Sequence, residues 1–210
     1  MISLSEILHT IAQALMIPCL IILLILMAGA VWQIGDIVVE YIAERRKHKC
    51  NVPQLLRDVH AAGADGLAEL IEDSGLLRRQ KKALLELAES RGLPKDTLTA
   101  LAERLLATEE ARNARTTSIT DMIAKLGPMF GLLGTLIPLG PGIVALGQGD
   151  TVTLSESMNV AFDTTIAGVI SAAVASVISN IRKRWYNDDM VSLETLMEAV
   201  LEEVTSDVEG

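Results

Sequence analysis

The chain has 210 residues, of which 50% are hydrophobic and 21% are charged, and its mean hydropathy is +0.38. This combination requires apolar and charged residues to be segregated along the chain, as in a membrane protein with a water-exposed domain. The net charge of −9 and the pI of about 4.8 argue against a nucleic-acid binder, because such proteins neutralise phosphates with clustered Lys and Arg.

The first long apolar segment lies near the N-terminus. No Asp, Glu, Lys or Arg occurs from Ile7 to Gly35, and the stretch from Ala14 to Ile34 is nearly pure hydrocarbon. A membrane helix needs about 20 such residues. We therefore predict an external tail over residues 1–13 and a first membrane helix over residues 14–39. A cleaved signal peptide is the alternative, but the apolar stretch is too long and its basic cluster follows it.

Residues 40–121 have a helical pattern, with breaks at Asp73-Ser74-Gly75 and at Gly92-Leu93-Pro94. Between the breaks, leucines recur at helical spacing among Arg, Lys and Glu, which predicts an amphipathic helix. Beyond the second break, no Pro or Gly occurs before Gly127, so we predict one long helix that continues from the insert into the second span.

The charge pattern of this insert is typical of a solvated packing domain, and a dedicated docking surface is the alternative interpretation. The insert contains no phosphate-binding glycine loop, nucleophile elbow or paired metal ligands. We therefore predict no enzyme activity, no cofactor and no metal site.

Residues 122–146 are the second predicted membrane helix. Gly127, Gly131 and Thr135 recur every four residues, so they share one helix face and permit close approach of a neighbouring backbone. Pro138 has no N–H to donate to the carbonyl four residues earlier, which predicts a kink and a polar spot beside the Thr135 hydroxyl. The alternative is a purely structural kink, with the Thr hydroxyl bonded back to its own helix.

Residues 147–156 are predicted to form a short external loop, and residues 157–181 the third membrane helix. The sequence Thr153-Leu-Ser-Glu156 has the capping-box pattern, which places the helix start near Leu154. Small residues follow one another along the helix: Ala161, Thr165, Gly168, Ala172, Ala175 or Ser176, and Ser179. Such a stripe requires a neighbouring helix, because small residues gain little from lipid contact.

Asp163 is the only acid well inside a predicted span. An acid there costs about 2.5 to 3.5 kcal/mol on insertion scales, so its side chain should face protein or water. At 100° per residue it points about 160° away from Thr165. Two interpretations remain open, a group on an ion path and a hydrogen-bonded acid in the outer vestibule.

The basic residues determine the predicted orientation. All 18 Lys and Arg lie between Arg45 and Lys125 or in the cluster 182–184, which places the N-terminus and the 147–156 loop outside the cell. Residues 182–210 are then a cytoplasmic helix or tail. Every Trp and Tyr lies near the cytoplasmic end of a span, as aromatic anchors do: Trp32, Tyr41, Trp185 and Tyr186. A soluble helical protein would not sort its charges this way, so the predicted fold class is an all-α polytopic membrane protein.

Two motifs resemble those of TolQ and ExbB proteins. The string Leu126-Gly-Pro-Met-Phe-Gly-Leu-Leu-Gly-Thr135 is similar to their second-span signature, APxLGLLGTVxG. The string Ala161-Phe-Asp-Thr-Thr165-Ile-Ala-Gly168 resembles their third-span pattern, AL.AT..G. Both occur in the expected order and in the expected spans. By this resemblance the chain is identified as a member of the MotA/TolQ/ExbB proton channel family, and its three spans place it nearer TolQ and ExbB than MotA.

The resemblance implies a homopentamer around a pore that holds the single membrane helices of a TolR-, ExbD- or MotB-like partner. The partner helix carries the ion-binding Asp, and conserved Thr hydroxyls of the pentamer line its path. The matching positions are Thr135 and Thr165, with Thr164 beside the latter. ExbB-like proteins also carry a Glu five residues before that Thr, where this chain has Val160, so the role of Asp163 stays open.

The function expected from this resemblance is that of the pore-forming subunit of an H⁺- or Na⁺-driven motor in the cytoplasmic (inner) membrane. The subunit would perform transport or envelope work through its partner. Gly127 with Gly131, and Gly168 with Ala172, are the expected helix-packing faces. The alternatives are a passive membrane scaffold and the membrane subunit of a multicomponent transporter. The only other contacts expected are with membrane lipid, and none with nucleic acid.

Overall fold

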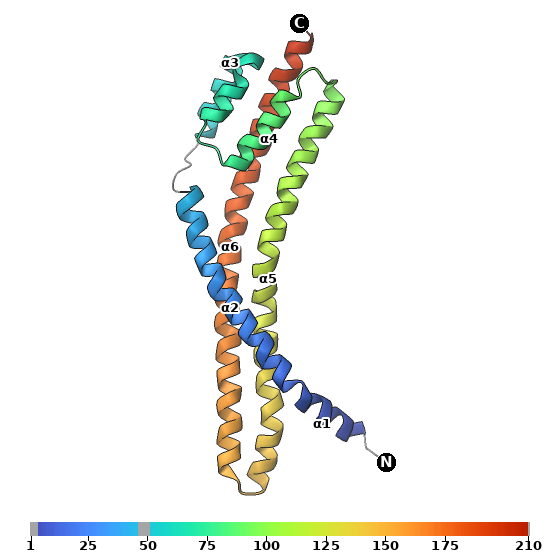
Figure 1. The fold of residues 1–210 in the computed structure, drawn as a ribbon, viewed down its shortest axis with the longest axis vertical. Helices are drawn as coiled ribbons and strands as arrows, with labels where there is room; N and C mark the ends of the chain where they lie inside the picture. The colour runs from blue at the N-terminus through green and yellow to red at the C-terminus, as the bar shows by residue number, and fades with distance from the viewer. Residues whose placement is uncertain (1–3, 46–50, 210) are drawn as a thin grey trace. The chain divides into compact units, whose positions relative to one another are not determined.

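The computed structural model describes residues 4–45 and 51–209, and within these ranges the chain is helical with no strand. In chain order (Figure 1) the elements are α1 (Leu4–Ala14), α2 (Met16–Glu40), a π-helical turn (Tyr41–Arg45), α3 (Val52–Asp73), α4 (Arg78–Glu89), α5 (Lys95–Gly147) and α6 (Thr151–Glu209). Three helical segments are long and apolar enough to cross a membrane: Glu6–Ala43, Lys95–Gly147 and Thr151–Thr205. The predicted all-α fold with three spans is confirmed.

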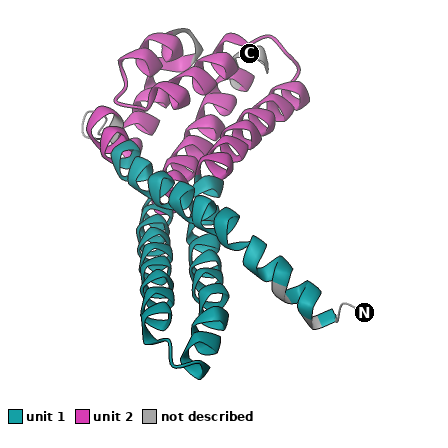
Figure 2. Ribbon diagram, turned by 60° about the horizontal axis from the view of Figure 1, so that its bottom comes forward, with its two compact units in different colours: residues 1–37, 117–181 teal, residues 38–116, 182–210 magenta. Residues whose placement is uncertain are grey.

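The chain forms two compact units, coloured separately in Figure 2. The membrane unit comprises residues 1–37 and 117–181, and the insert unit comprises residues 38–116 and 182–210. Part of the basic cluster that follows the first span, residues 46–50, lies outside the described residues, as do residues 1–3.

The N-terminal region, predicted only as a tail over residues 1–13, is helical from Leu4 to Ala14. Helices α1 and α2 are separated by a turn at Leu15. Pro18 has no N–H to donate to the carbonyl of Ala14, and its ring crowds that carbonyl. Proline therefore explains why the regular helix is interrupted one turn before it.

The expected long helix from the insert into the second span is present as α5, with 53 residues from Lys95 to Gly147. It begins directly after the predicted break at residues 92–94, and α3 ends at the predicted break at residues 73–75. Helix α5 stays helical through Pro128, Pro138 and Pro141. Helix α6 is longer still, because the third span and the C-terminal region form one helix of 59 residues.

The start of α6 differs from the prediction. The helix begins at Thr151, and the cap is Asp150: its Oδ1 accepts the backbone N–H groups of Val152 and Thr153 at 3.1 and 3.0 Å. The Thr153 hydroxyl donates to Asp150 Oδ2 at 2.6 Å, and this hydrogen bond is the main reason that the pKa of Asp150 is lowered. The predicted capping box at Thr153 was wrong, because Asp150 caps the helix first. Gly149, with φ of 78°, makes the turn that precedes it.

The insert unit has its own hydrophobic core, formed by α3, α4, the start of α5 and the end of α6. Among its most deeply buried side chains are Leu67, Leu84, Leu87, Leu98, Leu196 and Val200. Within α3 the backbone of Gly63 is non-helical, with φ of 61°, so this helix is kinked at Gly63. A core of this extent matches the interpretation of the insert as a packing domain.

A buried ion pair joins the end of α2 to α6 within the insert unit. Arg182 is 1% exposed, and its Nε donates to Glu40 Oε2 at 3.0 Å. Beside this pair the ring of Tyr41 stacks on that of Trp185, with centroids 6.1 Å apart. Because a buried charge that loses its partner is strongly destabilising, Arg182 and Glu40 constrain each other's position.

Candidate functional site

The core of the membrane unit is a close contact between α5 and α6, which lie side by side and are joined by a short turn (Figure 1). A Cβ added to Gly127 would lie 2.7 Å from the carbonyl oxygen of Gly168, and one added to Gly168 would lie 2.5 Å from that of Gly127. Gly131 and Ala172 belong to the same contact. The two backbones touch here, so no larger residue fits without moving a helix.

Gly134, rather than Thr135, continues this glycine face. A Cβ on Gly134 would lie 2.5 Å from Thr164 Cβ and 2.6 Å from Thr164 Oγ1. Thr164 is accordingly 5% exposed, whereas Thr135 lies to the side of the contact and is partly exposed. The sequence left both positions open, because a step of three residues from Gly131 stays on a helix face as well as a step of four.

All three candidate threonines donate their hydroxyl hydrogen within their own helix. Thr135 donates to the carbonyl of Leu132 at 2.7 Å, and Thr165 to that of Ala161 at 3.1 Å. Thr164 is 2.9 Å from the carbonyls of both Val160 and Ala161. This geometry, in which a Thr hydroxyl bonds back to a carbonyl of its own helix, is the one expected if the threonines are purely structural. A back-bonded hydroxyl oxygen still has acceptor capacity, and an acceptor is what a cation or a protonated carboxyl requires.

Asp163 does not lie in the α5–α6 contact. Its side chain is exposed on the surface of the membrane unit, as are the nearby apolar side chains of Phe162 and Ile166. Two residues further along α6, Thr165 is half-buried and points about 160° away from Asp163 at 100° per residue. A carboxyl in a membrane-crossing helix needs protein or water around it, and the single chain does not cover this one.

Helix α2 completes the membrane unit by packing Leu26 and Ala30 against Ile123 of α5 and Ala175 of α6. One helical turn after Ala175, the Ser179 hydroxyl of α6 donates to Asp121 Oδ1 of α5 at 2.5 Å. The sequence analysis placed Asp121 at the end of the insert and missed this pair. A single acid near Lys125 is an ordinary feature of the end of a membrane span, so no sequence pattern identifies this pair.

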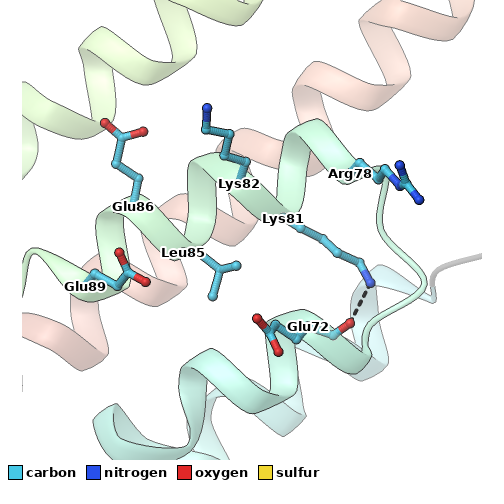
Figure 3. Close-up of a pocket in the computed structure, with 7 residues that line it drawn as sticks. All are labelled: Glu72, Arg78, Lys81, Lys82, Leu85, Glu86 and Glu89. Atoms are coloured by element: carbon cyan, nitrogen blue, oxygen red, sulfur yellow. Dashed lines mark hydrogen bonds between the residues drawn. The ribbon is translucent and has the colours of Figure 1, made fainter.

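A further candidate site in the insert unit is an open groove of about 670 Å³ along α3 and α4 (Figure 3). Its lining residues carry charges of both signs around one leucine: Glu72, Arg78, Lys81, Lys82, Leu85, Glu86 and Glu89. Lys81 Nζ donates to the backbone carbonyl of Glu72 at 2.7 Å, which ties α4 to the end of α3. This contact stabilises the unit internally and does not identify a ligand.

The fold and the site together define a polytopic membrane protein whose last two membrane-crossing helices pack through glycine and leave polar side chains beside the contact. Residues 69–195 of the 210 match the model of the MotA/TolQ/ExbB proton channel family, a range that includes the glycine contact between α5 and α6. The chain belongs to the MotA/TolQ/ExbB proton channel family. A comparison with curated proteins found no match.

The contact between Gly134 and Thr164 predicts the effect of one methyl group. Gly134→Ala should destabilise the protein by about 1–3 kcal/mol, because the added Cβ overlaps Thr164 and the helices must separate. Gly35→Ala in α2 is the control, since a Cβ there also meets nothing within 4 Å and alanine favours a helix interior. Thermal unfolding in detergent measures both, and equal melting temperatures for the two variants would contradict the close contact.

Proposed function

We propose that this protein is the pore-forming subunit of an ion-driven membrane motor, in which several copies surround the single membrane helix or helices of a partner. Ion flow through the complex is coupled to transport or envelope work performed by the partner. Membership of a proton channel family supports an ion-conducting role, and the partner and the work are inferred from the TolQ- and ExbB-like motifs.

The observation that carries the proposal is the set of polar groups left at the surface of the membrane unit. Thr135 and Thr165 are only partly buried, and Asp163 is exposed in a helix apolar enough to cross a membrane. Polar groups at such positions are expensive unless another chain or a water-filled path covers them. A ring of copies around a partner helix supplies both kinds of cover.

Within this proposal the threonines have two different roles. Thr135 and Thr165 offer hydroxyl oxygens as acceptors along the ion path, because their donated hydrogen is already used within the helix. Thr164 is a packing residue, since it is buried against Gly134. Asp163 lies apart from the threonines and contributes, at most, to the outer mouth of the path.

The energy available to such a motor is sufficient for a mechanical step. One unit charge that crosses a potential of 100 mV releases about 2.3 kcal/mol. If the ion passes only as the partner helix moves, this free energy drives the motion. The same physical argument applies to H⁺ and to Na⁺.

A passive scaffold that recruits proteins through the insert unit is the second candidate, and the charged groove along α3 and α4 favours it. A membrane subunit of a multicomponent transporter is a third. Neither requires the exposed hydroxyl groups of the membrane unit to act on an ion. The ion-flux experiment below therefore distinguishes both candidates from the motor.

The proposed assembly is a homopentamer. Mass measurement of the purified protein in detergent should give five times the chain mass of 22.6 kDa. Gly168→Leu should abolish this species, because a large side chain would push α6 away from α5 and distort each subunit. A stable wild-type monomer would overturn the assembly, whereas a pentamer formed by Gly168→Leu would show that the glycine contact is not needed for it.

The proposed orientation places the N-terminus and the α5–α6 turn outside the cell and the insert unit in the cytoplasm. A reporter fused after Glu156 should then be located outside the cell. Reporters fused within the insert or at the C-terminus should be located in the cytoplasm, because the basic residues stay on the cytoplasmic side. A cytoplasmic signal from the Glu156 fusion would contradict three spans in this orientation.

The ion path predicts opposite results for two kinds of threonine substitution. Thr135→Val and Thr165→Val keep the side-chain shape and remove the oxygen, whereas Thr135→Ser and Thr165→Ser keep the oxygen. Losing a hydrogen bond to a charged group costs about 1.5–3 kcal/mol, so each Val variant should slow ion flux roughly ten- to hundredfold. The Ser variants should retain most of the flux, and Asp163→Asn should have a smaller effect than either Val variant.

Flux is measured in vesicles that contain the assembled protein and its partner, after mass measurement has shown that each variant assembles normally. Thr164→Val is a further comparison, because its hydroxyl is buried against Gly134 and should affect stability rather than flux. Full flux in both the Thr135 and Thr165 Val variants would remove these residues from the path and favour the back-bonded structural interpretation.

A further inference from the structure

Helix α1 precedes the first span and has an apolar face that the chain leaves uncovered. The exposed fractions of its apolar side chains range from 44% to 75%, and the residues are Leu4, Ile7, Leu8 and Ile11, with Leu15 at 51% in the turn that follows. An apolar surface of this kind in a described helix requires a partner.

The apolar and polar residues of α1 lie on opposite sides of the helix. At 100° per residue, the apolar side chains from Leu4 to Leu15 fall within an arc of roughly 100°. Glu6, Thr10 and Gln13 lie on the other side, and the Thr10 hydroxyl donates to the backbone carbonyl of Glu6 at 2.9 Å. The helix is therefore amphipathic with a narrow and continuous apolar face.

The length of the helical segment shows that α1 and α2 do not both lie in the hydrocarbon core. The apolar segment from Glu6 to Ala43 has 38 residues and would be about 57 Å long as a straight helix, against about 30 Å for the core. Helix α2 alone, with 25 residues, is long enough to cross. Helix α1 is thus left at the end of the span, beside the membrane surface.

The turn at Leu15 gives α1 a direction of its own. Pro18 withdraws a hydrogen-bond donor from α2 at this point, and the N–H of Leu15 is shared between the carbonyls of Ile11 and Ala12 at 3.1 and 3.2 Å. A helix of 11 residues joined by such a turn can lie along the membrane surface while α2 crosses it.

We propose that α1 lies in the membrane–water interface at the N-terminal end of α2, with the face formed by Leu4, Ile7, Leu8, Ile11 and Leu15 buried at the headgroup and acyl-chain boundary. The occupant of this face is the lipid surface itself, because the face is continuous in the chain with a segment that enters the same bilayer. Helix α1 contains no Lys or Arg, so its binding depends on apolar burial and not on anionic lipid. Such a helix fixes the depth at which α2 enters the membrane.

The test uses single cysteines labelled with a small fluorophore, in full-length protein reconstituted in vesicles, after Cys19→Ser and Cys50→Ser remove the native thiols. Leu8→Cys and Ile11→Cys report on the apolar face, and Glu6→Cys and Gln13→Cys are the matched controls on the polar face. Brominated phospholipid quenches labels at the acyl-chain boundary, and iodide present on both sides of the membrane quenches labels in water. With iodide on both sides, the result does not depend on the orientation of the protein.

The proposal expects brominated lipid to quench the labels at residues 8 and 11 at least about twofold more than those at residues 6 and 13, with the reverse order for iodide. Equal quenching of all four by iodide would show a helix in water, and equal quenching by brominated lipid would show an inserted one. Protection of residues 8 and 11 from both quenchers would show that protein, such as a second copy of the chain, covers the face. Each of these three outcomes overturns the proposal.

Discussion

The membrane unit depends on backbone contact between α5 and α6. Three glycines of α5, at positions 127, 131 and 134, allow the helix to approach Thr164 and Gly168 closely, and Cβ atoms added at positions 127 and 134 would overlap α6. In lipid there is no hydrophobic driving force between helices, so this contact supplies the dispersion energy that holds them together. The positions of Thr135, Thr165 and Asp163 around the pair follow from which residues the contact uses.

The contact between α5 and α6 determines which of the three threonines stay accessible. Thr164 and Thr165 are neighbours in the chain and both donate to the carbonyl of Ala161, yet one is buried against Gly134 and the other remains partly accessible. An oxygen can serve a passing ion only if the ion can approach it. The proposed path therefore uses Thr165 together with Thr135, and Thr164 contributes to the fit between the helices.

The insert unit is held together by different forces. Its leucine-rich core is that of a water-soluble helical bundle, where burial of apolar area is the main stabilising term. Arg182 constrains this packing, because its buried charge requires a partner such as Glu40 at hydrogen-bond distance. The hydrophobic effect and this ion pair thus fix how the last part of α6 packs within its own unit.

The sequence by itself determined the helical class, the three membrane-crossing segments, the family and the long α5, because these depend on residue composition, periodicity and motif spacing along one chain. It also located the breaks near Gly75 and Pro94, since Gly and Pro act on the local backbone. Only the tertiary structure decided that Gly134 replaces Thr135 in the contact and that Asp121 bonds to Ser179. It likewise decided that Asp150 caps α6. Residues three and four positions along a helix lie on nearly the same face, so the sequence does not decide which of them packs against a neighbour. A pair separated by 58 residues, such as Asp121 and Ser179, has no local sequence signature. Those choices are made by the neighbouring helix, which the periodicity of a single segment does not describe.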